Sequence, residues 1–279
     1  MTTVFMFPGQ GSQSIGMGDK LFDRYPDLVS EADEVLGYSI KKLCLENPDS
    51  LLNRTDYTQP ALYIVNALSF LAKTEDDGIK PDYVIGHSLG EYSALYASGA
   101  FEFSTGLRLV QKRGSLMNAA TGGGMAAVLG MDGETVAAAL TELGAETIDV
   151  ANLNSPRQTV ISGIKEDVEK FAPQLTEKGA KRVVILPVSG AFHSRYMKPA
   201  ADEFEAFLSD FSFGGLNVPC IANCNAEEYT DELIASNLVR QIFNSVRWID
   251  TIKGLREKGA EKFIEVGPGT VLRGLARQI

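Results

Sequence analysis

The chain of 279 residues has few of the side chains that most often bind metals, with only two histidines and three cysteines. Three is an odd number for a disulfide framework, and the cysteines stand far from both histidines in sequence. Their spacing does not match the paired ligands of a zinc site. We therefore expect reduced thiols and no metal. The cysteines are Cys44, Cys220 and Cys224.

Positive charge is also scarce: 26 lysines and arginines stand against 36 aspartates and glutamates, for a net charge of −10. This balance excludes a broad surface for nucleic acid or anionic lipid, although a local basic patch is compatible with it. No stretch approaches the ~18 uncharged apolar residues of a membrane span, and the first residues have neither a basic start nor a long apolar run. We expect a cytoplasmic protein without nucleic-acid or membrane partners.

Both common nucleotide-binding loops are missing as well. Residues 9–13 begin like Gly-x-Gly-x-x-Gly, but Ser14 replaces the third glycine, and no clear second strand ends in an acidic residue at the expected distance. There is no Gly-x-x-x-x-Gly-Lys phosphate loop either. We therefore expect no bound cofactor.

What the chain does have is enough apolar sequence, 44% of residues, for one large domain that carries a small insert. Short β-rich runs alternate with apolar stretches of helical spacing. The predicted strands are residues 4–7, 83–85, 218–223 and 263–266, and the predicted helices are 61–72, 89–97 and 104–120. This alternation indicates an α/β sheet.

A different order begins after the glycine run 122–124, which we interpret as a hinge. The pattern here predicts strand, helix, strand, strand, helix, strand, which is typical of a ferredoxin-like unit of about 65 residues. The predicted elements are residues 125–131, 133–143, 147–151, 159–162, 166–177 and 182–188. We expect a ferredoxin-like small subdomain at 125–192, inserted into a large subdomain at 1–124 and 193–279.

One serine stands in a pattern that specifies a sharp strand-to-helix turn, Gly86-His87-Ser88-Leu89-Gly90. The Gly-x-Ser-x-Gly spacing also occurs by chance, and a serine that begins a helix can be a simple cap. Its place between a predicted strand and a predicted helix favours a nucleophile. The N–H of Leu89 would then point at a tetrahedral oxyanion, assisted by the helix dipole.

A serine hydroxyl needs a base, and the chain offers only His87 and His193. His87 directly precedes the serine, so its side chain leaves the backbone in a different direction, and His193 is the predicted base. The alternative for His193 is a hydrogen-bonded structural histidine. His87 either supports the turn or bonds near an acyl group, and both interpretations stay open.

An arginine falls on the apolar face of the helix predicted at 104–120. At ~100° per residue, Arg113 lies between Leu109 and Met117, whereas Arg108 and Lys112 lie on the polar side. A buried guanidinium must meet an anion, because an unpaired buried charge is very unfavourable. That anion is either an internal carboxylate or the carboxylate of a substrate, held bidentately.

Five segments together resemble the malonyl-CoA:acyl carrier protein acyltransferase family, and the likeness covers nearly the whole chain. They are Phe-Pro-Gly-Gln-Gly-Ser-Gln at 7–13, Gly-His-Ser-Leu-Gly-Glu at 86–91, Gln-Lys-Arg-Gly at 111–114, Gly-Ala-Phe-His-Ser at 190–194 and Glu-Val-Gly-Pro-Gly at 265–269. The chain is most similar to the discrete, trans-acting acyltransferases of bacterial polyketide synthases, with the fatty-acid enzymes as nearest relatives. The resemblance implies an α/β fold whose α/β-hydrolase-like core has a parallel sheet.

The resemblance implies a ping-pong reaction. Ser88 would be acylated by malonyl-CoA, His193 would act as base and acid, and Arg113 would bind the malonyl carboxylate. The phosphopantetheine thiol of an acyl carrier protein would then take the malonyl group, so the implied partners are malonyl-CoA and that carrier. We expect a monomer. Phe192, within Ala-Phe-His, would accompany malonyl preference, and we place it with His87 in the candidate pocket.

The resemblance also assigns supporting residues. Gln10 and the backbone N–H of Leu89 would form an oxyanion hole. Gln241 would hold His193 through its amide oxygen, in place of the aspartate of many triads. A neutral amide there would avoid repelling the malonyl anion.

Three alternatives compete with malonyl transfer. An acyl hydrolase that strips stalled acyl groups from carrier proteins shares the serine turn, but such relatives tend to lose the arginine at the position of Arg113. An ordinary α/β-hydrolase esterase is less favoured, because its histidine normally comes last, whereas residues 194–279 follow His193. A non-catalytic binding module would need no reactive Ser88.

Overall fold

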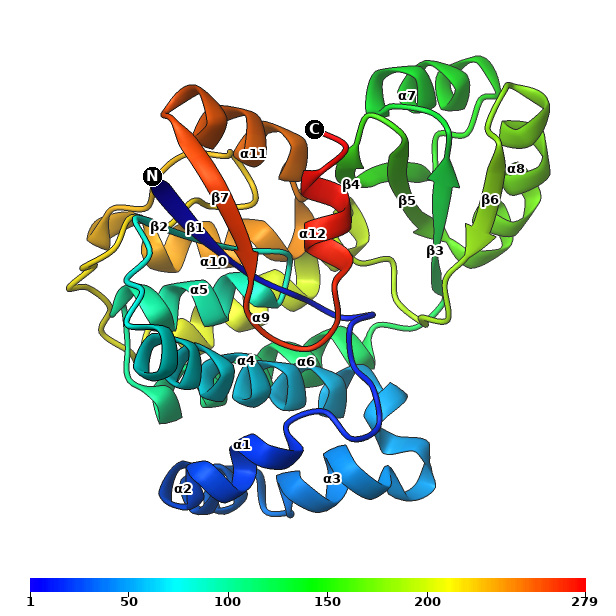
Figure 1. The fold of residues 1–279 in the computed structure, drawn as a ribbon. Coiled ribbons are helices and arrows are strands. Elements are labelled where there is room, and N and C mark those ends of the chain that lie inside the picture. The colour runs from blue at the N-terminus through cyan, green and yellow to red at the C-terminus, as the bar shows by residue number, and fades with distance from the viewer.

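The computed structural model describes all 279 residues and contains two separate β-sheets (Figure 1). The first sheet is parallel, in the order β2-β1-β7, and confirms the α/β class. Its strands are β1 (Thr2–Phe7), β2 (Tyr83–Gly86) and β7 (Ala260–Glu265). Because parallel strands end at the same edge, the loops that follow these three strands lie together.

Ten α-helices accompany the parallel sheet, either on its two faces or packed on the helices there. They are α1 (Asp19–Arg24), α2 (Pro26–Leu36), α3 (Ile40–Glu46), α4 (Thr55–Asp77), α5 (Gly90–Ser98), α6 (Phe103–Ala119), α9 (Lys198–Leu208), α10 (Ile234–Phe243), α11 (Trp248–Glu257) and α12 (Val271–Ala276). Short 3-10 helices lie at Pro48–Asn53, Arg195–Met197 and Asp231–Leu233. None of the helices combines the length and the apolar character that a membrane crossing would need.

The central strand β1 is buried on both faces, because alternate side chains of a strand point to opposite sides. Phe5 and Phe7 lie in the largest core cluster, which α4, α5 and α6 complete. Val4 and Met6 lie in a second cluster, which α11 and α12 complete. The unbroken apolar run at 4–7 is therefore the sequence of a central parallel strand.

The second sheet is small and antiparallel, in the order β4-β5-β3-β6. Its elements run strand, helix, strand, strand, helix, strand, which confirms the predicted order. They are β3 (Gly123–Leu129), α7 (Gly133–Glu142), β4 (Ile148–Ser155), β5 (Gln158–Ile164), α8 (Lys165–Glu177) and β6 (Arg182–Ile185). This segment has its own core of 13 buried residues, to which both helices contribute.

The two connections to the small sheet pass side by side at Gly123. Its N–H donates to the carbonyl of Ser189 at 3.2 Å, and a Cβ at this position would lie 2.1 Å from the nitrogen of Ala191. Only glycine allows so close a crossing. The predicted hinge at 122–124 is therefore wrong in part, since Gly123 and Gly124 already belong to β3 and only Gly122 has a positive φ, of 78°.

One predicted strand is wrong. Residues 218–223 form isolated bridges instead of a strand, among them a parallel bridge between Val84 and Cys220. The N–H of Val84 donates to the carbonyl of Pro219 at 2.9 Å, but Pro219 has no N–H with which to continue a ladder. The segment still runs beside β2 and leads to Asn223.

Candidate active site

Ser88 occupies a sharp turn between the end of β2 and the start of α5, as the sequence predicts. Its φ is +52°, a left-handed conformation that is uncommon for residues other than glycine. The flanking glycines make the turn possible: a Cβ at Gly86 would lie 1.9 Å from the carbonyl carbon of Gly90. A Cβ at Gly90 would lie 2.0 Å from the carbonyl oxygen of Phe7. The turn therefore presents Ser88 at the carboxyl edge of the parallel sheet.

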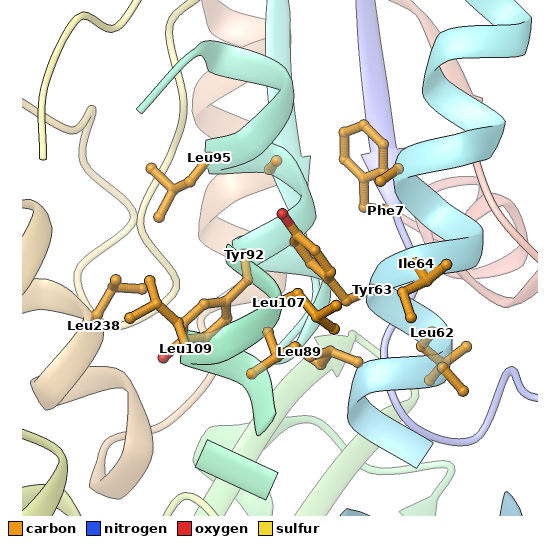
Figure 2. Close-up of a cluster of buried hydrophobic side chains, with 14 of the residues drawn as sticks. Phe7, Leu62, Tyr63, Ile64, Leu89, Tyr92, Leu95, Leu107, Leu109 and Leu238 are labelled. Atoms are coloured by element: carbon orange, nitrogen blue, oxygen red, sulfur yellow. The ribbon is translucent and has the colours of Figure 1, made fainter. Parts of the chain in front are cut away.

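The helix that follows the turn is anchored in the large core. Figure 2 shows Leu89 and Tyr92 among buried side chains of α4 and α6, beside Tyr63 and Leu107. Leu89 is 1% exposed, and Tyr92 is completely buried. This packing fixes the start of α5, and with it the position of the serine.

His193 meets Ser88 although 105 residues separate them in the chain. Its Nε2 lies 2.7 Å from Oγ of Ser88, and its Nδ1 lies 2.8 Å from the backbone oxygen of Gln241. A carbonyl only accepts hydrogen bonds, so Nδ1 carries the proton and Nε2 is free to accept from the serine hydroxyl. The structure thus brings together the two residues that the sequence pairs.

His193 is held in its neutral form. Burial, and after it the positive charge of Arg113, lower the pKa of His193 to about 3. The residue is 4% exposed. Near pH 7 the ring is therefore uncharged, which is the form that can take a proton from a hydroxyl.

Arg113 lies on α6 and is completely buried, as its place on the helical wheel predicts. Its Nη1 donates to Oε1 of Gln59 at 2.8 Å, and its Nη2 donates to Oε1 of Gln241 at 2.9 Å and to Oγ of Ser88 at 3.2 Å. The guanidinium also lies over the ring of Tyr92, with Cζ of Arg113 5.5 Å from the ring centroid. All of these partners are neutral. Of the two interpretations of Arg113, the one in which it pairs with an internal carboxylate is therefore wrong.

The guanidinium of Arg113 keeps donors in reserve. A guanidinium has five N–H groups, and the three hydrogen bonds to protein side chains leave two of them without an acceptor. Nε is one of these and is completely buried. Burial lowers the pKa of Arg113, but an arginine stays charged in proteins. A desolvated cation with spare donors therefore lies beside the Ser88 hydroxyl, where it can bind an anion.

The atom predicted for Gln241 is wrong. Its backbone carbonyl holds His193, whereas its amide oxygen accepts from Arg113. Its Nε2 donates to the backbone oxygen of Ser88 at 2.6 Å and to Oε2 of Glu91 at 2.7 Å. The physical reason is that a charged guanidinium binds an amide oxygen more strongly than a neutral imidazole does.

Leu89 and Gln10, the two residues predicted for the oxyanion hole, both lie next to the turn at Ser88. Their hydrogen bonds differ. The N–H of Leu89 has no acceptor in the protein and lies at the N-terminus of α5. The side-chain amide of Gln10, by contrast, donates to Oγ1 of Thr55 at 3.2 Å. The backbone N–H of Gln10 has no acceptor, and a Cβ at the preceding Gly9 would lie 3.6 Å from the nitrogen of Leu89. The loop after β1 is thus packed against the turn.

The two candidate pocket residues have different surroundings. Nε2 of His87 donates to Oδ1 of Asn154 on β4 at 2.7 Å, and its ring lies 5.5 Å from that of Trp248. This bond supports the turn, which was one of the two interpretations of His87. Phe192 is 5% exposed and belongs to the largest core cluster.

Sequence reasoning missed two residues at the turn. Asn223 accepts the N–H of Ser88 on Oδ1 and donates from Nδ2 to the carbonyl of Gly86, both at 2.7 Å. Glu91 is completely buried and accepts from Gln241. The glutamate at the end of Gly-His-Ser-Leu-Gly-Glu was a signal for Glu91, whereas no pattern marks Asn223.

Residues 4–278 match the protein family described as acyl transferase domain. The chain belongs to this acyl transferase family. The acyl transferase is 57% identical over 279 residues to the polyketide biosynthesis malonyl CoA-acyl carrier protein transacylase BaeC of Bacillus velezensis, a match that covers 99% of this chain and 96% of BaeC.

Two solved structures resemble this acyl transferase closely. The malonyl CoA-acyl carrier protein transacylase of Burkholderia pseudomallei gives a TM-score of 0.96 at 44% identity, with 100% of this chain and 97% of the other covered. The malonyl-transacylase PlMCAT, in complex with the type II PKS acyl-carrier protein AntF, gives 0.95 at 38% identity, with 100% and 93% covered.

Proposed function

We propose that this acyl transferase moves a malonyl group from malonyl-CoA to the phosphopantetheine thiol of an acyl carrier protein in bacterial polyketide biosynthesis. The observation that carries the proposal is Arg113, a buried cation with only neutral partners whose Nη2 lies 3.2 Å from Oγ of Ser88. In malonyl-CoA, a single methylene separates the thioester carbonyl from a carboxylate, so one substrate suits both residues. The names of the relatives support the same substrate and partner.

In the first half-reaction, Oγ of Ser88 attacks the thioester carbonyl carbon while Nε2 of His193 takes the hydroxyl proton. The carbon–sulfur bond then breaks, and the departing CoA sulfur takes the proton from His193. Thiols are stronger acids than alcohols, so this departure demands little of the acid. The product is a malonyl ester on Ser88.

In the second half-reaction, His193 removes the proton from the phosphopantetheine thiol, and the sulfur attacks the ester carbonyl carbon. The carbon–oxygen bond to Ser88 breaks, and His193 returns the proton to Oγ. The malonyl group leaves as a thioester of the carrier protein, and the free enzyme is regenerated in a ping-pong cycle.

Backbone N–H groups of Leu89 and Gln10 are the proposed donors to the oxyanion. Both lack an acceptor in the protein, and the dipole of α5 favours negative charge beside Leu89. For Gln10 the proposal moves from the side chain to the backbone, because Thr55 already accepts from the side chain.

The proposal extends to the finer architecture. Residues 1–124 and 193–279 form an α/β-hydrolase-like large subdomain, which the serine turn after a parallel strand supports. Residues 125–192 form a ferredoxin-like small subdomain, which the order of elements supports. The active site then lies where the two meet, with Phe192 and His87 beside the acyl pocket. A cytoplasmic monomer without metal or cofactor completes the proposal.

Transfer to a carrier protein separates this function from acyl hydrolysis. The purified chain is incubated with malonyl-CoA and a phosphopantetheine-bearing carrier protein, and the intact mass of the carrier is followed over time. We expect the carrier to gain one malonyl group, and the same carrier without phosphopantetheine to gain none. Release of free malonate with an unmodified carrier would instead establish a hydrolase.

A further inference from the structure

We propose that Glu91 and Gln241 are positioning residues that hold Arg113 in the orientation that selects acyl groups with a carboxylate. The inference rests on the proposed malonyl transfer, and it assigns two residues that act through Arg113 and not on the substrate. Glu91 lies on α5, Gln241 on α10 and Arg113 on α6, and all three side chains are completely buried.

The amide of Gln241 can take only one of its two orientations here. Its Nε2 faces two acceptors, the backbone oxygen of Ser88 at 2.6 Å and Oε2 of Glu91 at 2.7 Å. A flipped amide would set its oxygen against these two oxygens and its NH2 group against the guanidinium. The hydrogen bonds therefore aim Oε1 at Nη2 of Arg113.

Glu91 is fixed in turn by donors from another segment. One of its oxygens accepts the N–H of Asn223 at 3.1 Å and the hydroxyl of Tyr229, and the other accepts from Gln241. Burial raises the pKa of Glu91 to about 7, which reflects how costly a carboxylate is at this depth. We infer that Glu91 is kept at this depth, despite the cost of burying its carboxylate, because it orients the amide of Gln241.

Neutral amides orient Arg113 without cancelling its charge. Gln59 accepts from Nη1 and Gln241 accepts from Nη2, so the plane of the guanidinium is held from both ends. A carboxylate in place of either amide would form an ion pair and compete with the carboxylate of the acyl group. Glu91 instead stands one hydrogen bond further away, behind Gln241. The arrangement keeps a cation both oriented and available.

The first test replaces the amide of Gln241 by a thioether of similar length. Acylation of Ser88 from malonyl-CoA and from acetyl-CoA is measured as kcat/KM. We expect Gln241→Met to lower the malonyl-to-acetyl ratio about 10- to 100-fold, the usual effect of losing a hydrogen bond to a charged group. The matched control is Gln174→Met, which removes only a bond to the carbonyl of Lys170 within α8 and should leave the ratio unchanged. If kcat/KM of Gln241→Met fell by the same factor with malonyl-CoA and with acetyl-CoA, the inference would be overturned.

The second test asks whether Glu91 acts through Gln241. We expect Glu91→Leu to lower the malonyl-to-acetyl ratio more than Glu91→Gln, whose single amide oxygen can accept from Nε2 of Gln241 only if its NH2 group turns toward the N–H of Asn223. The double variant Glu91→Leu with Gln241→Met should fall no further than Gln241→Met alone, and additive losses would overturn the inference. If Glu91→Leu does not fold, Glu91→Gln and Gln241→Met decide the question.

A wild type that takes no malonyl group would overturn the proposed function itself, whereas loading with unchanged selectivity in Gln241→Met would overturn only this inference.

Discussion

Ser88, His193 and Arg113 meet at one atom, the hydroxyl oxygen of Ser88. This oxygen lies 2.7 Å from Nε2 of His193 and 3.2 Å from Nη2 of Arg113. A carboxylate accepts from a guanidinium more strongly than a hydroxyl does, so in the proposed reaction a malonyl group would take the hydrogen bond of Arg113 and leave Ser88 bonded to His193. It also offsets the positive charge that helps to lower the pKa of His193. The proposed function therefore predicts that recognition of the acyl group and activation of Ser88 are coupled.

Replacing Arg113 by alanine tests this recognition. We expect kcat/KM for malonyl loading to fall about 200- to 5000-fold, because breaking a buried charged pair costs about 3–5 kcal/mol. Loading from acetyl-CoA should fall much less, since an acetyl group has no carboxylate. Quenched-flow mass spectrometry of acylated Ser88 measures both rates. Equal losses for the two donors would make Arg113 a structural residue.

The pKa of His193 sets an acid limit on stability. It falls from 6.5 to about 3 on folding, so below pH 6.5 the unfolded chain binds a proton that the folded chain does not. The stabilisation is complete above pH 6.5 and is lost as the pH falls toward 3. We expect His193→Gln to lack this loss, which amounts to about 2.5 kcal/mol between neutral pH and about pH 4.5. Urea unfolding at several pH values measures it, and parallel curves for variant and wild type would refute the shift.

Among single residues, the sequence predicts which side chains come together more reliably than it predicts which of their atoms form the hydrogen bonds. Ser88 and His193 could be paired because a motif marks the serine and the chain offers only two histidines. The contact of Gln241 was wrong because a residue type does not specify whether its backbone or its side-chain oxygen accepts. Asn223 and Glu91 were missed because their bonds to the turn and to Gln241 arise from tertiary packing.

The element that matters most is the serine turn, a strained link between β2 and α5. A left-handed residue other than glycine costs about 1–2 kcal/mol, and Ser88 has a φ of +52°. Asn223 stabilises the turn by bonding both the N–H of Ser88 and the carbonyl of Gly86. The fold thus stores backbone strain at Ser88 and restrains it from a neighbouring segment.

Two variants of Ser88 isolate that strain. Both Ser88→Gly and Ser88→Ala lose the hydroxyl, but only glycine adopts the left-handed conformation without cost. We expect Ser88→Gly to be more stable than Ser88→Ala by about 1 kcal/mol in thermal or urea unfolding. In an ordinary helical position the order is reversed, so a more stable alanine variant would show that the turn is unstrained.

Elements with clear periodicity could be located but not always bounded, since the helix predicted at 61–72 runs from Thr55 to Asp77 as α4. Helix α6 runs from Phe103 to Ala119 where 104–120 was predicted, since its apolar face repeats at helical spacing. The strand at 218–223 was wrong, because a β-rich run does not reveal which N–H groups find partners, and Pro219 has none. The glycines at 123 and 124 were assigned to a hinge because a close crossing of two distant segments has no local signature.

At the scale of the whole molecule, one edge of β4 is joined to the segment between α10 and α11. The N–H of Leu153 donates to the carbonyl of Val246 at 2.9 Å, and the N–H of Val246 donates to the carbonyl of Ala151 at 2.9 Å. The bond from His87 to Asn154 lies along the same border, and Figure 1 shows α12 beside β4. His87, the residue before Ser88, is therefore hydrogen-bonded to the small sheet.

Variants of His87 and Asn154 test this tie. In a double-mutant cycle with His87→Ala and Asn154→Ala, we expect a coupling of about 1 kcal/mol in the free energy of unfolding. The two single variants should change malonyl loading by similar factors, because His87 acts through Asn154. Additive stability losses, or a loss of loading confined to His87→Ala, would instead give His87 a direct part in the chemistry.

The central claim is that Ser88 carries the malonyl group between donor and carrier. The intact mass of the chain after brief incubation with malonyl-CoA, before any carrier protein is added, tests it most directly. We predict a mass increase of one malonyl group, mapped to the peptide that contains Ser88, and no increase in Ser88→Ala. An unmodified wild type, or a Ser88→Ala variant that gains the same mass, would contradict the account.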